Sequence, residues 1–515
     1  MRATVALAGA CVLAIAGVAA AARPPVHGAV LVELAGVDAP SLRSLRGAGA
    51  TLVIARPSIW RLPAAAAARL VPQLERAGLV RAVAEDRTFT PLEAGIPTRA
   101  FTSNWWLDSL DAGALTPPGP GKRVFVVDTG LDFRHPEFGG RPNTVALDRQ
   151  QITSPDDFHG TAISSLIGGR GKEVGGIYPR ARLYEWDASE RDGLTLSSII
   201  AGIAAAARAG PGVINLSLGS AADVPMLQDV ILEAFRRGSV VVAASGDSRG
   251  FDFSPYPAGY PHVLAVGATD QHGDAAPFSS PSSTIDVAAP GVDVKVAVPR
   301  SHDPSGYMVA SGTSYAAALV SGALAWIWTV RPKLDNTQLI TLVRRTAKSR
   351  EAGGISNETG YGVLDLRAAL SAPAPPRDPL EPNDDVRLVR PGGLFAQGSS
   401  LLTTPRKGTA VLRARVDQNK DPADVYRAYI PPQQSLSATV DAQSGDVVLR
   451  VWGPHTPTIL ERGAVERRDL LAARPLRHHE SVAVRNRGTT GEVVYVDVSA
   501  GVSRTSSYTL RLTTG

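Results

Sequence analysis

The segment from residue 122 to 370 alternates short runs of apolar, often β-branched residues with longer helical stretches. Strand-like runs are predicted at 123–127, 182–185, 213–216, 240–244 and 263–266. Helices are predicted at 161–167, 196–208, 226–237 and 313–330, and Asp335 or Asn336 is expected to cap another that reaches residue 347. Strands that are apolar at every position need cover on both faces. The pattern therefore predicts an α/β fold, with helices on both faces of a parallel sheet.

The segments on either side of this unit have different patterns. Residues 27–92 combine strand-like runs with a helix at 64–77, which indicates a small α+β unit. A Pro/Ala-rich linker follows residue 370, and beyond it strand-like runs without helices predict a small all-β sandwich. The expected order is a leader at 1–22, the α+β unit at 23–95, the parallel-sheet unit at 96–370, the linker at 371–380 and the sandwich at 381–515.

The first 22 residues have the pattern of a secretory signal peptide. Arg2 precedes an apolar stretch at 3–21, and small residues at 19–22 offer a cleavage site. An uncleaved membrane anchor is the alternative, because the stretch is nearly long enough to span a bilayer. The only cysteine is Cys11, inside this segment, so disulfides, thiolate metal sites and a cysteine nucleophile are excluded from the mature protein. We expect a secreted protein, extracellular or periplasmic.

The charge of the chain gives little indication of a nucleic-acid or membrane partner. A formal net charge of +5 is spread over 515 residues, with no dense basic block interleaved with aromatics. Such a block is the usual signature of nucleic-acid binding. We therefore expect a monomer with no nucleic-acid partner and, once the signal peptide is removed, no membrane contact.

Three short motifs supply residues that are suited to nucleophilic catalysis. Asp128 ends a predicted buried strand in V-V-D-T-G, His159 stands in D-F-H-G-T, and Ser314 begins an apolar helix in S-G-T-S-Y-A-A-A. Each has an ordinary alternative: a turn aspartate, a surface or capping histidine, and a serine helix cap. Together, and in this order, they can form a triad in which a carboxylate orients a histidine that activates a serine hydroxyl.

These motifs resemble the three signature blocks of the subtilase family, over about residues 100–370. The resemblance implies a subtilisin-like catalytic domain and a serine endopeptidase that acts on proteins or peptides through an acyl-enzyme. It implies that Asp128 orients His159, that His159 acts as general base and then acid, and that Ser314 attacks the scissile carbonyl.

The same resemblance extends to the predicted substrate-binding residues. I-N-L-S-L-G resembles the family's substrate-binding strand, so Ser217, Leu218 and Gly219 are expected to pair with the substrate backbone. Residues 243–246 are expected to line the pocket for the side chain that precedes the cleaved bond: Ala243, Ala244, Ser245 and Gly246.

One position departs from the family in a way that affects the chemistry. Asp247 stands where the family usually has an asparagine whose amide stabilises the oxyanion. An ionised Asp247 would repel the developing charge, and losing one such donor costs roughly 100- to 1000-fold in rate. A protonated Asp247 could still donate, because apolar surroundings raise the pKa of a carboxyl group. We expect an active enzyme that is fastest on the acid side.

The flanking units have family counterparts too. The 23–95 unit resembles the inhibitor-like propeptide of subtilases. The resemblance implies that this unit blocks the cleft until cleavage within 87–99 removes it. An unrelated N-terminal module is the alternative. The C-terminal unit, which begins P-L-E-P-N-D-D, resembles the pre-peptidase C-terminal domain of secreted bacterial peptidases.

No cofactor follows from the sequence with certainty. Glu137 matches a calcium-ligand position of the family, but the loop at 168–176 is basic and lacks the Asn-rich pattern of its calcium loop, so calcium stays an open question and no metal ligands are assigned. His478, His479 and Glu480 lack a zinc spacing, and we expect them in a solvated turn.

Two other functions compete with this interpretation. D-T-G is also the signature of aspartic proteases, but these need a second D-[ST]-G, which the chain lacks. A catalytically silent subtilase fold that serves as a binding protein is the second alternative, and Asp247 is its one argument.

Overall fold

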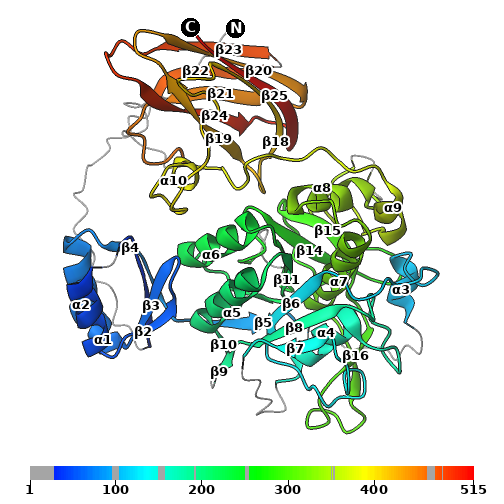
Figure 1. The fold of residues 1–515 in the computed structure, drawn as a ribbon. Helices are drawn as coiled ribbons and strands as arrows, with labels where there is room; N and C mark the ends of the chain where they lie inside the picture. The colour runs from blue at the N-terminus through cyan, green and yellow to red at the C-terminus, as the bar shows by residue number, and fades with distance from the viewer. Residues whose placement is uncertain are drawn as a thin grey trace, which may run out of the picture.

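The computed structural model describes residues 28–36, 38–94, 104–148, 157–190, 193–249, 255–349, 351, 354–460, 470–477 and 479–515. The predicted signal peptide lies outside the described residues. Figure 1 shows an N-terminal unit beside a large central unit, with a C-terminal unit of strands above the central one.

The N-terminal unit has the predicted α+β architecture and consists of a four-stranded sheet with two helices. Its strand order is β2-β3-β1-β4, with β1 in the interior. Val30 and Val32 on β1 pack into a core with the helices, whereas Leu31 between them packs into the core of the central unit. The sheet therefore has helices on one face and the central unit on the other. Its elements are β1 (Val30–Leu34), α1 (Ala39–Gly47), β2 (Thr51–Ile54), β3 (Ser58–Leu62), α2 (Ala64–Arg76) and β4 (Val80–Glu85).

The central unit is built on a seven-stranded sheet whose neighbouring strands all run parallel. The strand order is β15-β14-β13-β11-β6-β8-β7. This confirms the predicted parallel sheet. Its strands are β6 (Arg123–Asp128), β7 (Thr144–Ala146), β8 (Arg182–Asp187), β11 (Gly212–Leu216), β13 (Val240–Ala244), β14 (Val263–Thr269) and β15 (Ile285–Pro290).

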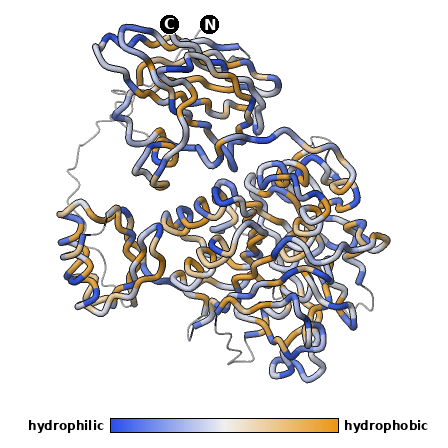
Figure 2. The backbone as a smooth tube through the Cα atoms, viewed as in Figure 1, coloured by the Kyte–Doolittle hydropathy of each residue, from blue (hydrophilic) through white to orange (hydrophobic). Residues whose placement is uncertain are grey.

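Helices cover both faces of this sheet, which explains why its inner strands β11, β13 and β14 are almost entirely apolar. On β6, Val124 and Val126 pack in one core with α4 and α7, and Phe125 and Val127 pack in the other with α5 and α6. Figure 2 shows the apolar stretches running along the inner strands and helices. The helices are α3 (Trp105–Ser109), α4 (His159–Gly168), α5 (Leu196–Ala209), α6 (Pro225–Arg236), α7 (Thr313–Val330), α8 (Asn336–Thr346) and α9 (Leu366–Ser371).

Helix α7 runs through the middle of the core. Among the described residues it is the one helix long and apolar enough to cross a membrane, but 89% of its apolar window is buried inside the protein. Its length and hydropathy therefore reflect its place in the core. Asp335 caps α8 through a reciprocal capping box with Gln338, as the sequence predicted.

Short strands border the central sheet. Strands β16 (Val294–Ala297) and β17 (Tyr307–Ala310) form a hairpin. A separate four-stranded sheet has the order β12-β5-β10-β9 and joins N-terminal residues to central ones. Its members are β5 (Thr88–Pro91), β9 (Ser189–Glu190), β10 (Gly193–Thr195) and β12 (Leu218–Gly219).

The C-terminal unit is a sandwich of two four-stranded antiparallel sheets around one apolar core, as predicted. The sheet orders are β18-β25-β20-β23 and β19-β24-β21-β22. A short helix, α10 (Val386–Val389), precedes the sandwich. The strands are β18 (Thr409–Asp417), β19 (Ala423–Ile430), β20 (Ser435–Ser444), β21 (Val447–Trp452), β22 (Leu470–Arg477), β23 (His479–Arg485), β24 (Glu492–Ala500) and β25 (Thr505–Thr514).

The close approach of α5 to the sheet gives a prediction about stability. A Cβ atom at Gly202 would lie 2.7 Å from Trp186 Cδ1 and 2.9 Å from Val127 Cγ1. We expect Gly202→Ala, in a Ser314→Ala background, to lower the free energy of unfolding by about 1–2 kcal/mol, because overpacking outweighs the gain in helix propensity. Chemical denaturation measures this. Gly47→Ala in α1 is the control: a Cβ there meets nothing within 4 Å, so a loss as large as that of Gly202→Ala would contradict the packing argument.

Candidate active site

The structure brings Asp128 and His159 together at the carboxyl edge of the central sheet. Asp128 is the last residue of β6, and His159 is the first residue of α4. Asp128 Oδ1 lies 2.8 Å from His159 Nδ1, and both side chains are 1% exposed. Asp128 therefore fixes the orientation of the imidazole and leaves Nε2 facing the cleft.

The glycines of D-T-G and H-G-T allow this approach. A Cβ on Gly160 would lie 2.3 Å from the carbonyl oxygen of Gly130, so the two backbones touch where a side chain would block them. Gly160 N also donates to Thr129 Oγ1 at 2.9 Å. The backbones of D-T-G and H-G-T thus pack directly against each other, which explains why both motifs contain a glycine close to the functional residue.

Ser314 lies near the start of α7 at the same edge of the sheet. Its hydroxyl donates to Ser217 O at 3.0 Å, and Ser217 Oγ donates in return to Ser314 O at 3.0 Å. His159 Nε2 has no hydrogen-bond partner among the described residues. The structure therefore contains the Asp–His contact but not a His–Ser hydrogen bond, and a catalytic triad would require the Ser314 hydroxyl to turn toward His159.

The electrostatics of the cleft act on His159. Burial lowers the pKa of His159, but the charge and hydrogen bond of Asp128, together with Glu93 and Asp247, outweigh this and raise the pKa above its ordinary value. Glu93 Oε1 lies 3.8 Å from His159 Nε2. A carboxylate near that nitrogen stabilises the imidazolium form, which cannot act as a base.

Strand β5 of the N-terminal unit occupies the cleft. It pairs antiparallel on one side with β12, with Pro91 opposite Leu218 and Thr90 opposite Gly219. On its other side it pairs with β10, where Phe89 lies opposite Leu194. The predicted substrate-binding residues therefore hold a backbone strand, and that strand comes from the chain itself (Figure 1).

The residues after β5 pass directly by Ser314. Leu92 N lies 3.2 Å from Ser314 Oγ, and Ala94 N donates to Ser311 O at 2.8 Å. Between them, Glu93 accepts a hydrogen bond from Tyr315 Oη at 2.7 Å. The amide nitrogen of Leu92 thus lies beside the hydroxyl of Ser314, and the Leu92–Glu93 bond is the next peptide bond along the chain.

Two apolar side chains of this segment fill subsites. A Cβ on Gly219 would lie 3.0 Å from Leu92 Cδ1, so Leu92 rests against a glycine. Phe89 is 1% exposed within the apolar core that contains Leu194 and Leu218. The predicted pocket residues lie at the end of β13 and just beyond it, all four buried: Ala243, Ala244, Ser245 and Gly246. No described contact joins them to Leu92.

Asp247 also borders the cleft. Its Oδ1 accepts a hydrogen bond from Thr313 N at 2.9 Å, and its Oδ2 is buried without a partner. A Cβ on Gly312 would lie 2.5 Å from Leu92 O and 3.1 Å from Asp247 Oδ2, so both oxygens flank the same glycine. Burial raises the pKa of Asp247 to about 6, more strongly than the Thr313 hydrogen bond lowers it. A proton on Oδ2 would make this side chain a donor toward the cleft.

Glu137 does not have the surroundings of a metal ligand. Its Oε1 accepts hydrogen bonds from Glu173 N at 2.8 Å and Val174 N at 3.2 Å, and its Oε2 accepts one from Lys172 N at 3.4 Å. Calcium needs several free oxygen ligands, whereas these oxygens are used by amide donors. Glu137 therefore holds the basic loop at 168–176 in place, and its surroundings do not fit a calcium ion.

The structure corrects two features of the sequence interpretation. His479 and Glu480 begin strand β23, not a turn; His479 is exposed and its Nδ1 lies 2.5 Å from Asp441 Oδ1, whereas Glu480 is buried. His478 lies outside the described residues. The functional segment that was not predicted from the sequence is strand β5, Thr88–Pro91. Its Thr-Phe-Thr alternation was the available signal.

Comparisons of sequence match the central unit to known proteases. The sequence profile of the subtilase family matches residues 119–362. Subtilisin BL of Lederbergia lenta is 36% identical over 254 residues, which are 49% of this chain and 91% of that protein. An alkaline protease of Alkalihalobacillus alcalophilus is 34% identical over 285 residues, which are 54% of this chain and 72% of that protein.

Solved structures share the fold. Fervidolysin from Fervidobacterium pennivorans, a keratinolytic enzyme related to subtilisin, aligns with a TM-score of 0.59 at 19% identity and covers 89% of this chain and 85% of that one. The epidermin leader peptide processing serine protease from Staphylococcus aureus aligns with a TM-score of 0.56 at 20% identity, over 67% and 99% of the two chains. The predicted fold class is thereby confirmed.

Proposed function

The chain belongs to the subtilase family of serine endopeptidases, and we propose that it hydrolyses peptide bonds with Ser314 as nucleophile, His159 as general base and Asp128 as the residue that orients His159. The observation that carries this proposal is the position of Leu92, whose amide nitrogen lies 3.2 Å from Ser314 Oγ and whose carbonyl oxygen flanks Gly312 beside Asp247, together with Asp128 on Nδ1 of His159.

In the proposed reaction, Ser314 Oγ attacks the substrate carbonyl carbon while His159 Nε2 takes its proton. The negative charge that develops on the carbonyl oxygen faces Asp247 Oδ2 and the start of α7, if the substrate lies as Leu92 does. A helix N-terminus and a protonated carboxyl group both stabilise such a charge. His159 then protonates the leaving amine, and water releases the acyl group by the reverse steps.

We propose that the N-terminal unit is a propeptide that inhibits the enzyme until Leu92–Glu93 is cut. Two effects keep the uncut chain inactive. Strand β5 pairs with β12 and β10 and so blocks the substrate-binding cleft, and Glu93 raises the pKa of His159, which favours the imidazolium form. Cleavage would free Glu93 to leave His159. This bond lies within the 87–99 zone expected from the sequence and sets the end of the propeptide at Leu92.

Secretion through residues 1–22 is part of the proposal, and similarity to the minor extracellular protease Epr of Bacillus subtilis supports a role outside the cell. We propose protein or peptide substrates, a monomeric enzyme, and a C-terminal sandwich of the pre-peptidase type. A catalytically silent binding protein is the competing function, for which Asp247 is the argument.

Labelling with a fluorophosphonate separates these two functions. We expect the mature protein to be labelled at Ser314, because a serine activated by His159 reacts with this electrophile. Gel fluorescence and peptide mapping measure the label. Ser314→Ala should remove it, whereas Ser311→Ala should keep it. Mature protein that stays unlabelled between pH 5 and 8 would support the silent binding protein.

The pKa values of the cleft predict a pH optimum above 6, between the pKa of Asp247 and the raised pKa of His159. Asp247 is neutral below about pH 6, whereas His159, with its raised pKa, is a free base only at higher pH. Both conditions are met best between the two pKa values, so kcat/KM should be bell-shaped. Asp247→Asn donates at every pH and should remove the alkaline limb. Because pH 8 lies about two units above the pKa of Asp247, kcat/KM of Asp247→Asn at that pH should be roughly 100-fold higher than that of the wild type.

The control for this experiment is Asp303→Asn, a half-buried loop residue of the central unit whose own Oδ1 accepts a hydrogen bond from Ser305 N. Its pH profile should follow that of the wild type from pH 4.5 to 9. An Asp247→Asn profile that also follows the wild type at every pH would refute a role for Asp247 at the oxyanion.

The cleft segment also predicts the preferred substrate. Acetyl-Phe-Thr-Pro-Leu p-nitroanilide reproduces residues 89–92 and should be cleaved efficiently by the mature enzyme. Replacing its Phe by Ala should lower kcat/KM roughly 10- to 200-fold, because the pocket that buries Phe89 is then empty. Replacing Thr by Ala should change it little, since Thr90 is exposed. Equal rates for the three peptides would contradict the assignment of subsites.

A further inference from the structure

The turn between β18 and β19 of the sandwich inserts a lysine side chain into the central unit. Lys420 is 2% exposed, although it belongs to a turn that connects two strands of the sandwich. Asp417 Oδ1 accepts hydrogen bonds from Asn419 N and Lys420 N, both at 3.0 Å, and so shapes this turn. The turn thereby carries an ammonium group across the boundary between the two units.

The partners of this ammonium group are backbone carbonyls of the central unit. Lys420 Nζ donates to Ala258 O at 2.6 Å and to Tyr260 O at 3.3 Å, and Lys420 O accepts from His262 N at 2.9 Å. Burying an ammonium group costs free energy unless hydrogen bonds and an opposite charge compensate it. Asp286, whose Oδ2 lies 3.9 Å from Lys420 Nζ, supplies the opposite charge.

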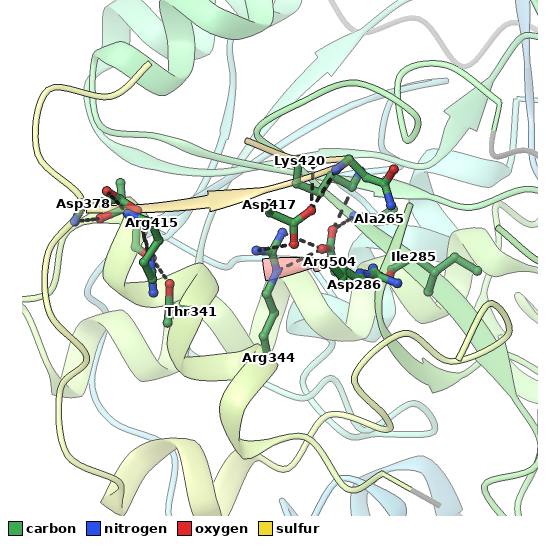
Figure 3. Close-up of polar contacts among 12 residues, drawn as sticks. Ala265, Ile285, Asp286, Thr341, Arg344, Asp378, Arg415, Asp417, Lys420 and Arg504 are labelled. Carbon is green, nitrogen blue, oxygen red and sulfur yellow. Dashed lines mark hydrogen bonds and ion pairs between the residues drawn. The ribbon is translucent and has the colours of Figure 1, made fainter. Parts of the chain in front are cut away.

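Figure 3 shows Lys420 and Asp417 of the sandwich beside Asp286 and Arg344 of the central unit. Arg344 Nη2 lies 2.6 Å from Asp286 Oδ1, and Arg344 Nη1 lies 3.8 Å from Asp417 Oδ2. Asp286 Oδ2 also accepts a hydrogen bond from Ala265 N at 2.8 Å. Asp286 is thus bonded by a guanidinium and an amide, whereas the ammonium group of Lys420 is bonded to the two carbonyls.

The two carbonyls belong to a compact turn at 255–260 that borders the cleft. A hydrogen bond from Gly259 N to Pro255 O, at 3.1 Å, closes this turn. Tyr256 N donates to Ser220 O at 2.8 Å, and Ser220 N donates to Tyr256 O at 2.9 Å. Because Ser220 directly follows β12, the turn is joined to the strand that pairs with β5.

Pro255 of this turn lies against the subsite that holds Leu92. A Cβ on Gly219 would lie 3.0 Å from Leu92 Cδ1 and 3.1 Å from Pro255 Cγ, so both side chains flank one glycine. A Cβ on Gly246 would lie 2.8 Å from Pro255 Cδ. Pro255 thus reaches two of the residues expected to bind substrate, and a shift of the turn would change the wall beside Leu92.

We propose that Lys420 is a positioning residue for the substrate side chain that precedes the cleaved bond. Its ammonium group holds the carbonyls of the 255–260 turn, and the turn holds Pro255 beside Gly219. The wall formed in this way selects the residue that takes the place of Leu92. The inference rests on the proposed function and adds to it a role in specificity for the C-terminal sandwich.

The preference between two substrates tests this role. Mature wild type, Lys420→Met and Asn419→Ala are compared on acetyl-Phe-Thr-Pro-Leu and acetyl-Phe-Thr-Pro-Ala p-nitroanilides, with the active enzyme counted by fluorophosphonate titration of Ser314. Lys420→Met leaves two buried carbonyls without their donor, so the turn relaxes. We expect the ratio of kcat/KM for the Leu substrate over the Ala substrate to fall about 10-fold, through a higher KM for the Leu substrate.

Asn419→Ala is the matched control. Asn419 lies in the same turn of the sandwich and donates to Ser283 O at 2.8 Å, which is outside the 255–260 turn. Its loss removes a bond between the same two units, so the substrate ratio should stay at the wild-type value. A wild-type ratio in Lys420→Met, or equal losses in both variants, would make Lys420 a structural anchor alone and overturn the proposal.

A second variant decides if Lys420→Met yields no titratable Ser314. Lys420→Gln keeps an amide donor on a shorter side chain: a lowered substrate ratio supports the proposal, and an unchanged ratio overturns it. Failure of the proposed function would look different, because the wild type itself would then neither react with the fluorophosphonate nor cleave either substrate.

Discussion

The two ladders that hold β5 are the interaction on which the rest of the account depends. Antiparallel pairing with β12 on one side and β10 on the other leaves no freedom of register, because a slip by one residue would turn Phe89 out of its core. With the register fixed, Leu92 and Glu93 must lie at Ser314. The structure therefore shows the cleft occupied by a segment of the chain itself, and the subsites can be assigned from the side chains of that segment.

The sequence predicted the parts of the site that local chemistry determines. The glycines of D-T-G and H-G-T touch backbone to backbone, so the motifs that place Asp128 and His159 are visible in the order of residues alone. The parallel sheet was predicted from continuous apolar runs, as in β6, whose alternate apolar residues pack into two different cores. These features depend on contacts that residue type and short spacing specify.

What the sequence could not predict depends on contacts between distant segments. Strand β5 has four residues and contains a proline, so its conformation comes from partners at 193–195 and 218–219. Likewise, Lys420 belongs to a stretch that is unremarkable in sequence, and only the packing of the sandwich on the central unit brings its ammonium group to the carbonyls of Ala258 and Tyr260. The role of Glu137 also needed the loop at 172–174 in three dimensions.

Asp247 links the site to its regulation. In the uncut chain its charge and that of Glu93 both favour the imidazolium form of His159, so the groups that border the scissile bond also restrain the base that would cut it.

The central claim is that Ser314 cuts the bond that β5 presents to it, and the N-terminus of the mature protein tests this most directly. The protein is produced as wild type and as Ser314→Ala, and the N-terminus of the largest stable fragment is identified by mass spectrometry. The account predicts Glu93 as the first residue of the wild type and an uncut Leu92–Glu93 bond in Ser314→Ala. A mature N-terminus elsewhere in the chain, or the same cut in Ser314→Ala, would contradict it.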